Sequence, residues 1–224
     1  MVLERRRLLP AHLLRPALAL VVPCLIVVGA LGAEVAGNTD AGPVDQAAFE
    51  VFWLRRDIVT PLAVSTNPAV MITVITLVVG IALWHRRPRV ALLAVLGPVV
   101  AAGVNTWVLK PFFDRTHDGY LAYPSGHTTT LVSILAVITL VVAANAAPGR
   151  RVGATLGVGA TALGLVAVGA WAIIGARYHY LSDTLGSLFW GVAVVIVIAA
   201  AIDAVAKPVG DPRTVRSASG NTAR

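Results

Sequence analysis

Six long apolar runs alternate with short polar segments along the chain. Each run lacks Asp, Glu, Lys and Arg and is close to the ~20 residues (range about 17–25) that a helix needs to cross a bilayer. Lipid offers no partner for a free peptide group, and no run alternates with the period of two of a membrane barrel strand, so helices are the predicted spanning form. The predicted spans are residues 16–33, 68–84, 90–109, 128–148, 152–176 and 184–202.

The composition supports a membrane protein. Of the 224 residues, 57% are hydrophobic and 13% are charged, against about 45–50% and about 25% in soluble domains. The mean hydropathy is +0.80. We therefore predict an all-α fold, a polytopic bundle of six transmembrane helices forming one domain over residues 1–206. Residues 207–224 are rich in Ser, Gly, Pro and Arg and are predicted to be a disordered cytoplasmic tail.

The distribution of positive charge predicts the orientation. With six spans, both termini and the turns at 85–89 and 147–151 share one side, which holds 13 of the 18 Lys and Arg residues. The positive-inside rule makes that side cytoplasmic in the inner (plasma) membrane. No basic face with interleaved aromatic residues is present, so a nucleic-acid partner is not expected. The cytoplasmic set is Arg5, Arg6, Arg7, Arg15, Arg86, Arg87, Arg89, Arg150, Arg151, Lys207, Arg213, Arg216 and Arg224.

The first extracytoplasmic connection, residues 38–67, mixes aromatic and charged side chains. The composition of residues 47–62 predicts an amphipathic helix that lies in the membrane interface and ends before Pro61. The helix could form a lid or wall beside a lipid-entry cleft or serve only as a solvated connector. A cleaved signal peptide is the alternative for the first span, but its apolar run exceeds the 7–15 residues of a typical signal sequence. The only cysteine, Cys24, excludes an intrachain disulfide.

Polar residues gather in three stretches that the six-span layout places on the extracytoplasmic side. They are residues 110–117 (KPFFDRTH), 124–127 (PSGH) and 177–183 (RYHYLSD). The first ends the third span, the second opens the fourth, and the last joins the fifth to the sixth. Taken singly, each stretch has a structural explanation, such as a helix cap, interfacial tyrosines or basic side chains that reach for lipid headgroups. Their convergence on one membrane face instead indicates a site.

The histidines and one carboxylate suggest the chemistry of that site. His179 and Asp183 are four residues apart and would lie on one face of a helix. A carboxylate that accepts a hydrogen bond from one imidazole nitrogen leaves the other nitrogen free as a nucleophile. His127 supplies a second imidazole that could protonate a leaving oxygen as general acid, which contributes about 10²–10⁴-fold.

The remaining polar residues of these stretches suit a phosphate group. Ser125 and Gly126 precede a helical run, whose first backbone N–H groups form an anion site. Lys110 and Arg115 supply positive charge for phosphate oxygens, with Arg as the better bidentate partner.

The three stretches resemble the signature of the type 2 phosphatidic acid phosphatase superfamily, which also includes vanadium haloperoxidases. The middle motif of that family, Pro-Ser-Gly-His, is present at 124–127, and its third motif ends in His-x-x-x-Asp, as at 179–183. The resemblance implies a metal-free and cofactor-free enzyme with His179 as nucleophile, Asp183 as its orienting carboxylate and His127 as acid. It assigns the phosphoryl oxygens to Lys110, Arg115, Ser125 and Gly126.

The chain departs from the family pattern at two positions. The family's first motif has Arg-Pro seven residues after its Lys, where this chain has His117 and Asp118, so Arg115 would have to serve. The third motif carries Arg six residues before its His, where this chain has Ile173, and Arg177 is the candidate substitute. Both departures concern the phosphate pocket more than the catalytic residues.

The predicted function is therefore hydrolysis of a lipid-linked phosphomonoester or diphosphate at the extracytoplasmic face, through a phosphohistidine. The substrate partner would be a polyprenyl diphosphate, phosphatidic acid, phosphatidylglycerophosphate or polyprenyl-linked sugar phosphate, taken from the surrounding membrane lipids. A lipid phosphotransferase and a non-catalytic lipid-phosphate-binding protein are the alternatives. A haloperoxidase is disfavoured because those enzymes are soluble, and a transporter because charges lining a pathway are missing from the spans.

Overall fold

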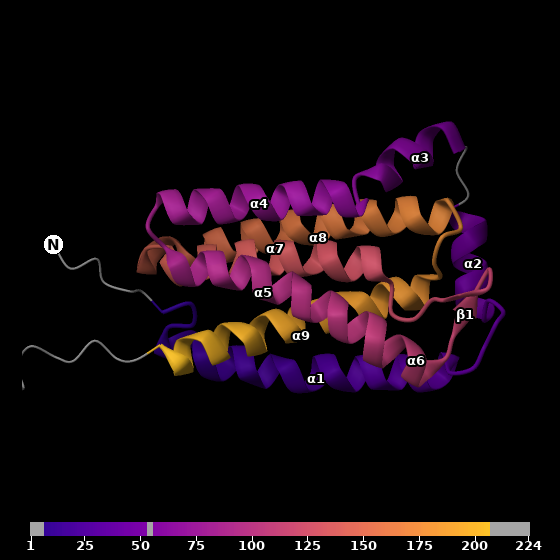
Figure 1. The fold of residues 1–224 in the computed structure, drawn as a ribbon, viewed down its shortest axis with the longest axis horizontal. Coiled ribbons are helices and arrows are strands. Elements are labelled where there is room, and N and C mark those ends of the chain that lie inside the picture. The colour runs from indigo at the N-terminus through magenta and orange to yellow at the C-terminus, as the bar shows by residue number, and fades with distance from the viewer. Residues whose placement is uncertain (1–6, 53–55, 207–224) are drawn as a thin grey trace, which may run out of the picture.

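The computed structural model describes residues 7–52 and 56–206, which form a bundle of long, roughly parallel helices (Figure 1). In this part of the chain six helical stretches are long and apolar enough to cross a membrane, as predicted. Each begins at least two residues before its charge-free run, and the second includes a separate short helix, Arg56–Val64. The stretches are Ala11–Val35, Asp57–Trp84, Pro88–Phe113, Gly126–Asn145, Pro148–Gly175 and Leu181–Val205.

The helices are joined by short turns and one small hairpin. The hairpin consists of β1 (Thr116–His117) and antiparallel β2 (Tyr120–Leu121). A π-helical turn, Asn105–Leu109, joins α5 to α6, and a 3₁₀ turn, Pro148–Arg150, precedes α8. The helices are α1 (Ala11–Val35), α2 (Pro43–Val51), α3 (Arg56–Val64), α4 (Pro68–Trp84), α5 (Pro88–Val104), α6 (Lys110–Phe113), α7 (Gly126–Asn145), α8 (Arg151–Gly175) and α9 (Leu181–Val205).

Helix α9 lies at the centre of the bundle and packs against α1, α5 and α7, while α4 packs on α5 and α8 on α7. Small residues permit the close approach, since a Cβ at Gly186 would lie 2.5 Å from the Tyr123 ring and one at Gly191 would lie 2.8 Å from Val132. The residues that α9 presents at its first turn are therefore held by neighbours on several sides.

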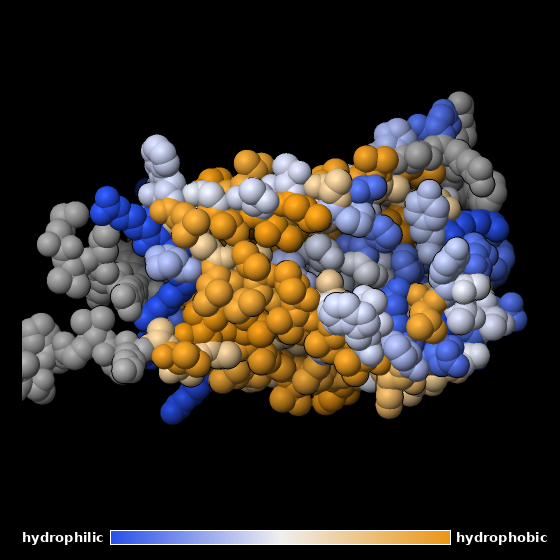
Figure 2. Space-filling view, in the orientation of Figure 1, coloured by the Kyte–Doolittle hydropathy of each residue, from blue (hydrophilic) through white to orange (hydrophobic). Residues whose placement is uncertain are grey.

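The two ends of the bundle differ. Figure 2 shows an apolar band around the middle and hydrophilic residues toward both ends. At one end the backbone N–H of Leu9 donates to Asp203 at 2.8 Å and Arg89 pairs with Asp203 at 3.3 Å, so the segment before α1, the first turn of α5 and the end of α9 meet. Helix α2 and the β1–β2 hairpin lie at the opposite end (Figure 1).

The first long connection differs from the predicted single helix over 47–62. Two helices replace it: α2 ends at Val51, and α3 begins at Arg56, contains Pro61 and leads into α4; residues 53–55 lie outside the described part. Pro61 lies inside α3, so the prediction that the helix ends before this proline is wrong; proline has no N–H and cannot donate the usual i→i−4 hydrogen bond to the Asp57 carbonyl. Phe49 is buried against Ile174 and Tyr180, so α2 is a packed wall at the end of the bundle and not a solvated connector.

The third span contains a π-helical turn just before the first polar stretch. Asn105 opens this turn, is fully buried, and donates its side-chain amide to Thr129 of α7 at 2.9 Å. Such turns insert one residue into a helix and often occur at functional sites. Lys110 follows immediately as the first residue of α6.

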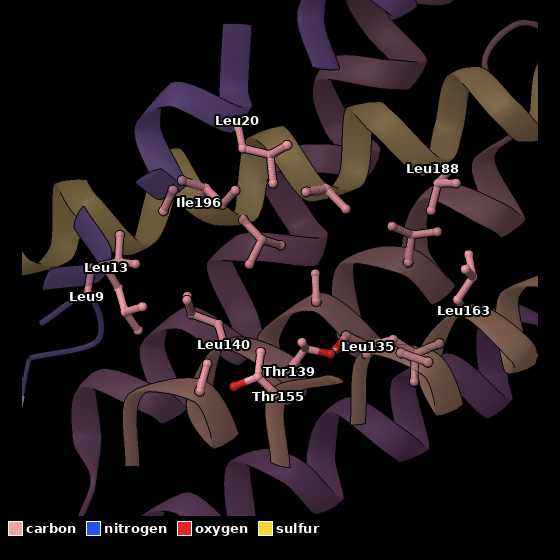
Figure 3. A pocket seen from close by; sticks show the side chains of 18 of the residues that line it. Leu9, Leu13, Leu20, Leu135, Thr139, Leu140, Thr155, Leu163, Leu188 and Ile196 are labelled. Atoms are coloured by element: carbon pink, nitrogen blue, oxygen red, sulfur yellow. Dashed lines mark hydrogen bonds between the residues drawn. The ribbon is translucent and has the colours of Figure 1, made fainter. Parts of the chain in front are cut away.

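One cavity, of about 480 Å³, lies among α1, α7, α8 and α9. Leucine, valine and alanine side chains form most of its walls, with Thr139 and Thr155 as polar exceptions (Figure 3). None of its lining residues is ionisable, so this cavity can hold hydrocarbon but offers nothing that could act on a phosphate.

Candidate active site

A different cavity, of about 400 Å³, receives residues from all three polar stretches. Lys110 from the first stretch, Gly126 and His127 from the second and His179 from the third line its polar end. The six-span layout therefore places the three stretches together, as the sequence predicted. Four of the eight predicted site residues reach this cavity, and the other four lie behind or beside it.

His179 and Asp183 form a buried hydrogen-bonded pair. Nδ1 of His179 lies 3.3 Å from Oδ2 of Asp183, and the two residues are 9% and 0% exposed. His179 precedes α9 instead of lying within a helix, and Asp183 folds back as the carboxylate of a capping box, accepting the Tyr180 backbone N–H at 3.0 Å. A carboxylate can only accept, so Nδ1 of His179 carries the proton and Nε2 keeps its lone pair.

His127 lies in the first turn of α7, on the same cavity as His179. The imidazole rings of His127 and His179 have centroids 6.2 Å apart, inclined at 64°. Both rings line the same cavity. The two imidazoles, one in α7 and the other in the segment just before α9, therefore border the same space.

The start of α7 combines an internal cap with an open face. Ser125 is fully buried, and its hydroxyl accepts the Thr128 N–H at 3.4 Å while its own N–H donates to the backbone oxygen of Asp183 at 3.2 Å. Ser187 donates to the Ser125 carbonyl at 2.8 Å. These bonds join the first turns of α7 and α9. At Gly126 a Cβ would meet nothing within 4 Å, so the cavity approaches the backbone there.

Lys110 brings positive charge to the cavity. Its ammonium group donates to the carbonyl of Leu121 in β2 at 2.7 Å. An ammonium has two further donors. The hairpin therefore holds the Lys110 side chain in place, and the remaining donors can serve a phosphate oxygen in the cavity that Lys110 lines.

Arg115 does not line this cavity, although the sequence suggested it as a phosphate ligand. Its side chain is 1% exposed, and its terminal nitrogens bond to Asp183 at 2.8 Å and to Asp45 at 2.6 Å. One of them also donates to the hydroxyl of Ser182. The Arg115 guanidinium is thus paired with two buried carboxylates. It contacts Asp183 and does not reach the cavity.

Asp45 is a site residue that the sequence analysis missed. It lies in α2, is 3% exposed, and accepts the Ser182 backbone N–H at 2.9 Å in addition to the Arg115 bond. Its only sequence signal is a carboxylate in the extracytoplasmic segments, where a buried Arg115 would need a partner. Asp45 and Arg115 lie 70 positions apart in the sequence, so the pairing is not evident from it.

Arg177 also stands outside the cavity lining. It adopts a left-handed backbone conformation with φ of 58°, is exposed, and holds its guanidinium carbon 5.3 Å from the centre of the Phe49 ring. Its carbonyl accepts a hydrogen bond from His117 Nε2 at 2.7 Å. Its contacts thus lead to α2 and β1.

Tyr180 covers the buried ion pair from one side. The guanidinium carbon of Arg115 lies 4.1 Å from the centre of its ring, and the hydroxyl donates to the Thr39 carbonyl at 3.2 Å. Burial raises the pKa of Tyr180 more than the nearby Arg115 lowers it. Tyr180 therefore acts as a neutral donor that ties the loop before α2 to the site.

Three comparisons relate this arrangement to known proteins. A family model described as "PAP2 superfamily" matches residues 70–206. Among solved structures, the fold resembles the crystal structure of the first transmembrane PAP2 type phosphatidylglycerolphosphate phosphatase from Bacillus subtilis. That match has a TM-score of 0.63 and 16% sequence identity, and it covers 84% of this chain and 96% of the other. The predicted helical membrane fold is confirmed by this structural match. No curated protein matches.

Proposed function

Since this chain belongs to the PAP2 superfamily, we propose that it hydrolyses a lipid-linked phosphate through a phosphohistidine on His179. The observation that carries this proposal is the meeting of His179, His127 and Lys110 at the polar end of one cavity. A nucleophile, an acid and a cation are the parts that phosphoryl transfer needs, since it depends chiefly on positioning and charge stabilisation.

In the first step, Nε2 of His179 attacks phosphorus and the bond to the lipid oxygen breaks. His127 gives a proton to that oxygen, and the lipid leaves as an alcohol or, from a diphosphate, as a monophosphate. The phosphorylated His179 ring carries positive charge, which Asp183 stabilises through the Nδ1 proton. In the second step neutral His127 takes a proton from water, whose oxygen attacks phosphorus and releases inorganic phosphate and His179.

Charge on the phosphoryl oxygens would be met by Lys110 and by the backbone N–H groups at the start of α7, where Gly126 leaves the space open. Ser125 would act as the cap that holds this turn. No group of three or more His, Cys, Asp or Glu side chains in residues 7–52 and 56–206 is arranged to hold a metal ion, and a metal-free reaction stays a prediction.

The rest of the cavity suits the hydrocarbon part of a lipid. Beyond its polar end, the walls come from α4 and α5 and are almost entirely apolar: Met71, Ile72, Ile75, Pro98, Val99 and Ala102. Ile72 and Val99 are also more than half exposed on the outside of the bundle, where lipid would lie. A lipid tail could therefore pass between α4 and α5 while its phosphate reaches the histidines.

The orientation follows from charge. The positively charged end of the bundle would be cytoplasmic, which places the histidines and α2 on the extracytoplasmic side of the plasma membrane. The substrate would then be a phosphatidic acid, phosphatidylglycerophosphate or polyprenyl diphosphate presented at that face.

Phosphate release by the purified protein in detergent, with EDTA present, tests the proposal. The panel should contain the three lipid classes, with His179→Ala as the inactive control. Brief reaction with ³²P-labelled substrate should label the wild type with phosphate that is stable to alkali and lost in acid, as expected for phosphohistidine. Absence of release and of labelled protein in a folded sample would favour a binding protein, whereas transfer of label to an added alcohol would favour a phosphotransferase.

A further inference from the structure

Three buried charged side chains, those of Asp45, Arg115 and Asp183, form a connected series of ion pairs next to His179. Arg115 lies between Asp45 and Asp183, with side-chain exposures of 1%, 4% and 0%. Unpaired charges at such depth are strongly destabilising, so each member needs the others. In this series of ion pairs, Asp45 lies on α2, Arg115 in the segment after α6 and Asp183 on α9.

The two carboxylate oxygens of Asp183 have different partners. Oδ1 receives the Arg115 guanidinium at 2.8 Å, and Oδ2 faces Nδ1 of His179 at 3.3 Å. Arg115 therefore fixes the rotation of the carboxylate that orients His179. It does so without lining the cavity where the substrate phosphate would bind.

Asp45 fixes Arg115 in turn. Its carboxylate accepts from Arg115 at 2.6 Å and from both the N–H and the hydroxyl of Ser182, the residue next to Asp183. The packing of Phe49 on Tyr180, with ring centres 5.4 Å apart, adds an apolar contact between the same elements. Helix α2 is thereby attached to the first turn of α9.

We propose that Asp45 and Arg115 are positioning residues, a buried clamp through which α2 holds the Asp183–His179 pair in its reactive arrangement. Arg115 then serves the carboxylate and not the substrate phosphate. This inference rests on the proposed function, because it assigns Asp183 and His179 to catalysis.

The clamp has an electrostatic consequence with a definite sign. The charged and titratable groups around His179 are Asp183 on α9, His127 on α7 and Lys110 on α6, with Arg115 and Asp45 behind Asp183 and with His117 of β1 and Tyr180 at its side. Without the charge of Asp45, Arg115 acts on Asp183 alone, so Asp183 stabilises positive charge on the His179 ring less. Without the charge of Arg115, Asp183 stabilises that positive charge more.

The test is steady-state kinetics from pH 5 to 9 on purified Asp45→Asn, Arg115→Gln and the double variant, with Glu50→Gln as the matched control on the exposed face of α2. Asp45→Asn should lower kcat about 10- to 100-fold, as expected for a small misplacement of the nucleophile, with KM changed less than twofold. Its acidic limb of kcat/KM should move to lower pH and that of Arg115→Gln to higher pH. Glu50→Gln should match the wild type.

Arg115→Lys and the double variant keep the test decisive if Arg115→Gln does not fold. The neutral double variant should fold and show the low kcat, whereas Arg115→Lys should recover part of it. A raised KM with unchanged kcat in the Arg115 variants would overturn the proposal in favour of a phosphate ligand, and wild-type kinetics in Asp45→Asn would overturn it outright. Failure of the proposed function differs, since it would leave the wild type inactive and indistinguishable from His179→Ala.

Discussion

His127 and His179 face each other across one cavity with ring centres 6.2 Å apart, although they lie 52 positions apart in the sequence. Each ring is fixed from a different helix start: His127 lies in the first turn of α7, and His179 is held by Asp183 in the first turn of α9. An attacking and a protonating group on opposite sides of one phosphorus atom need such an arrangement.

Replacing His127 should separate substrates by their leaving groups. His127→Ala should lower kcat about 10²–10⁴-fold for an alkyl or lipid phosphate, because the alkoxide then leaves without a proton. An aryl phosphate has a far better leaving group and should lose much less in the first step, as measured by the burst of released phenol. His85→Ala, an exposed histidine at the other end of the bundle, is the control. Equal losses on both substrates would contradict an acid role.

Lys110 should contribute to phosphate binding. Lys110→Met removes the ammonium group beside the cavity, and a charged hydrogen bond of about 1.5–3 kcal/mol corresponds to a loss of roughly 10–150-fold in kcat/KM. Lys110→Arg should keep part of the activity. Because Lys110 also holds Leu121, the melting temperature of each variant should be recorded. A fall in melting temperature without a change in kcat/KM would assign Lys110 to the hairpin alone.

Filling the apolar part of the cavity should affect long-chain substrates alone. Ile75→Trp should reduce kcat/KM on a long-chain lipid phosphate and leave a short, water-soluble phosphate unaffected, since only the former would occupy the space between α4 and α5. Leu77→Trp, on the exposed face of the same helix, is the matched control. Parallel losses on both substrates would indicate a distorted site instead of a blocked tail path.

The contact between Gly186 and Tyr123 should be sensitive to one added methyl group. A Cβ at Gly186 would lie 2.5 Å from the Tyr123 ring, whose hydroxyl donates to the Val28 carbonyl at 2.7 Å. Gly186→Ala should therefore destabilise the protein by about 1–3 kcal/mol through overpacking. Gly157→Ala in α8, where a Cβ meets nothing within 4 Å, should be neutral or slightly stabilising. Thermal unfolding in detergent measures both, and equal melting temperatures would refute the packing argument.

Labelling of introduced cysteines should reveal the orientation. In a Cys24→Ala background, Tyr120→Cys lies at the histidine end of the bundle, and Arg150→Cys lies at the positively charged end; both positions are exposed. A membrane-impermeant maleimide should label Tyr120→Cys in cells whose plasma membrane is intact and Arg150→Cys only after lysis. The reverse pattern would place the site in the cytoplasm.

The sequence predicted the helices better than the paths of the long side chains. Charge-free runs identify spans directly, because desolvation of charge dominates in lipid. The spans in turn place the three polar stretches at one end, and short side chains such as His127 follow the backbone into the cavity. Arg115 has several rotatable bonds, and its choice between phosphate and carboxylate depended on Asp45, a partner far away in sequence. The break between α2 and α3 escaped prediction since their residues form one continuous amphipathic pattern.

The π-helical turn between α5 and α6 acts as an adjustment of helical phase. If residues Asn105–Leu109 formed regular α-helix, every later residue of the span would turn by about 100° around the axis, the angle that one residue occupies. Lys110 would then leave the cavity while the α5 residues before the turn kept their contacts with α7 and α9. The third span can thus direct the side chains of α5 toward α7 and α9 and still direct Lys110 into the cavity. The Asn105–Thr129 hydrogen bond lies where the helical phase changes.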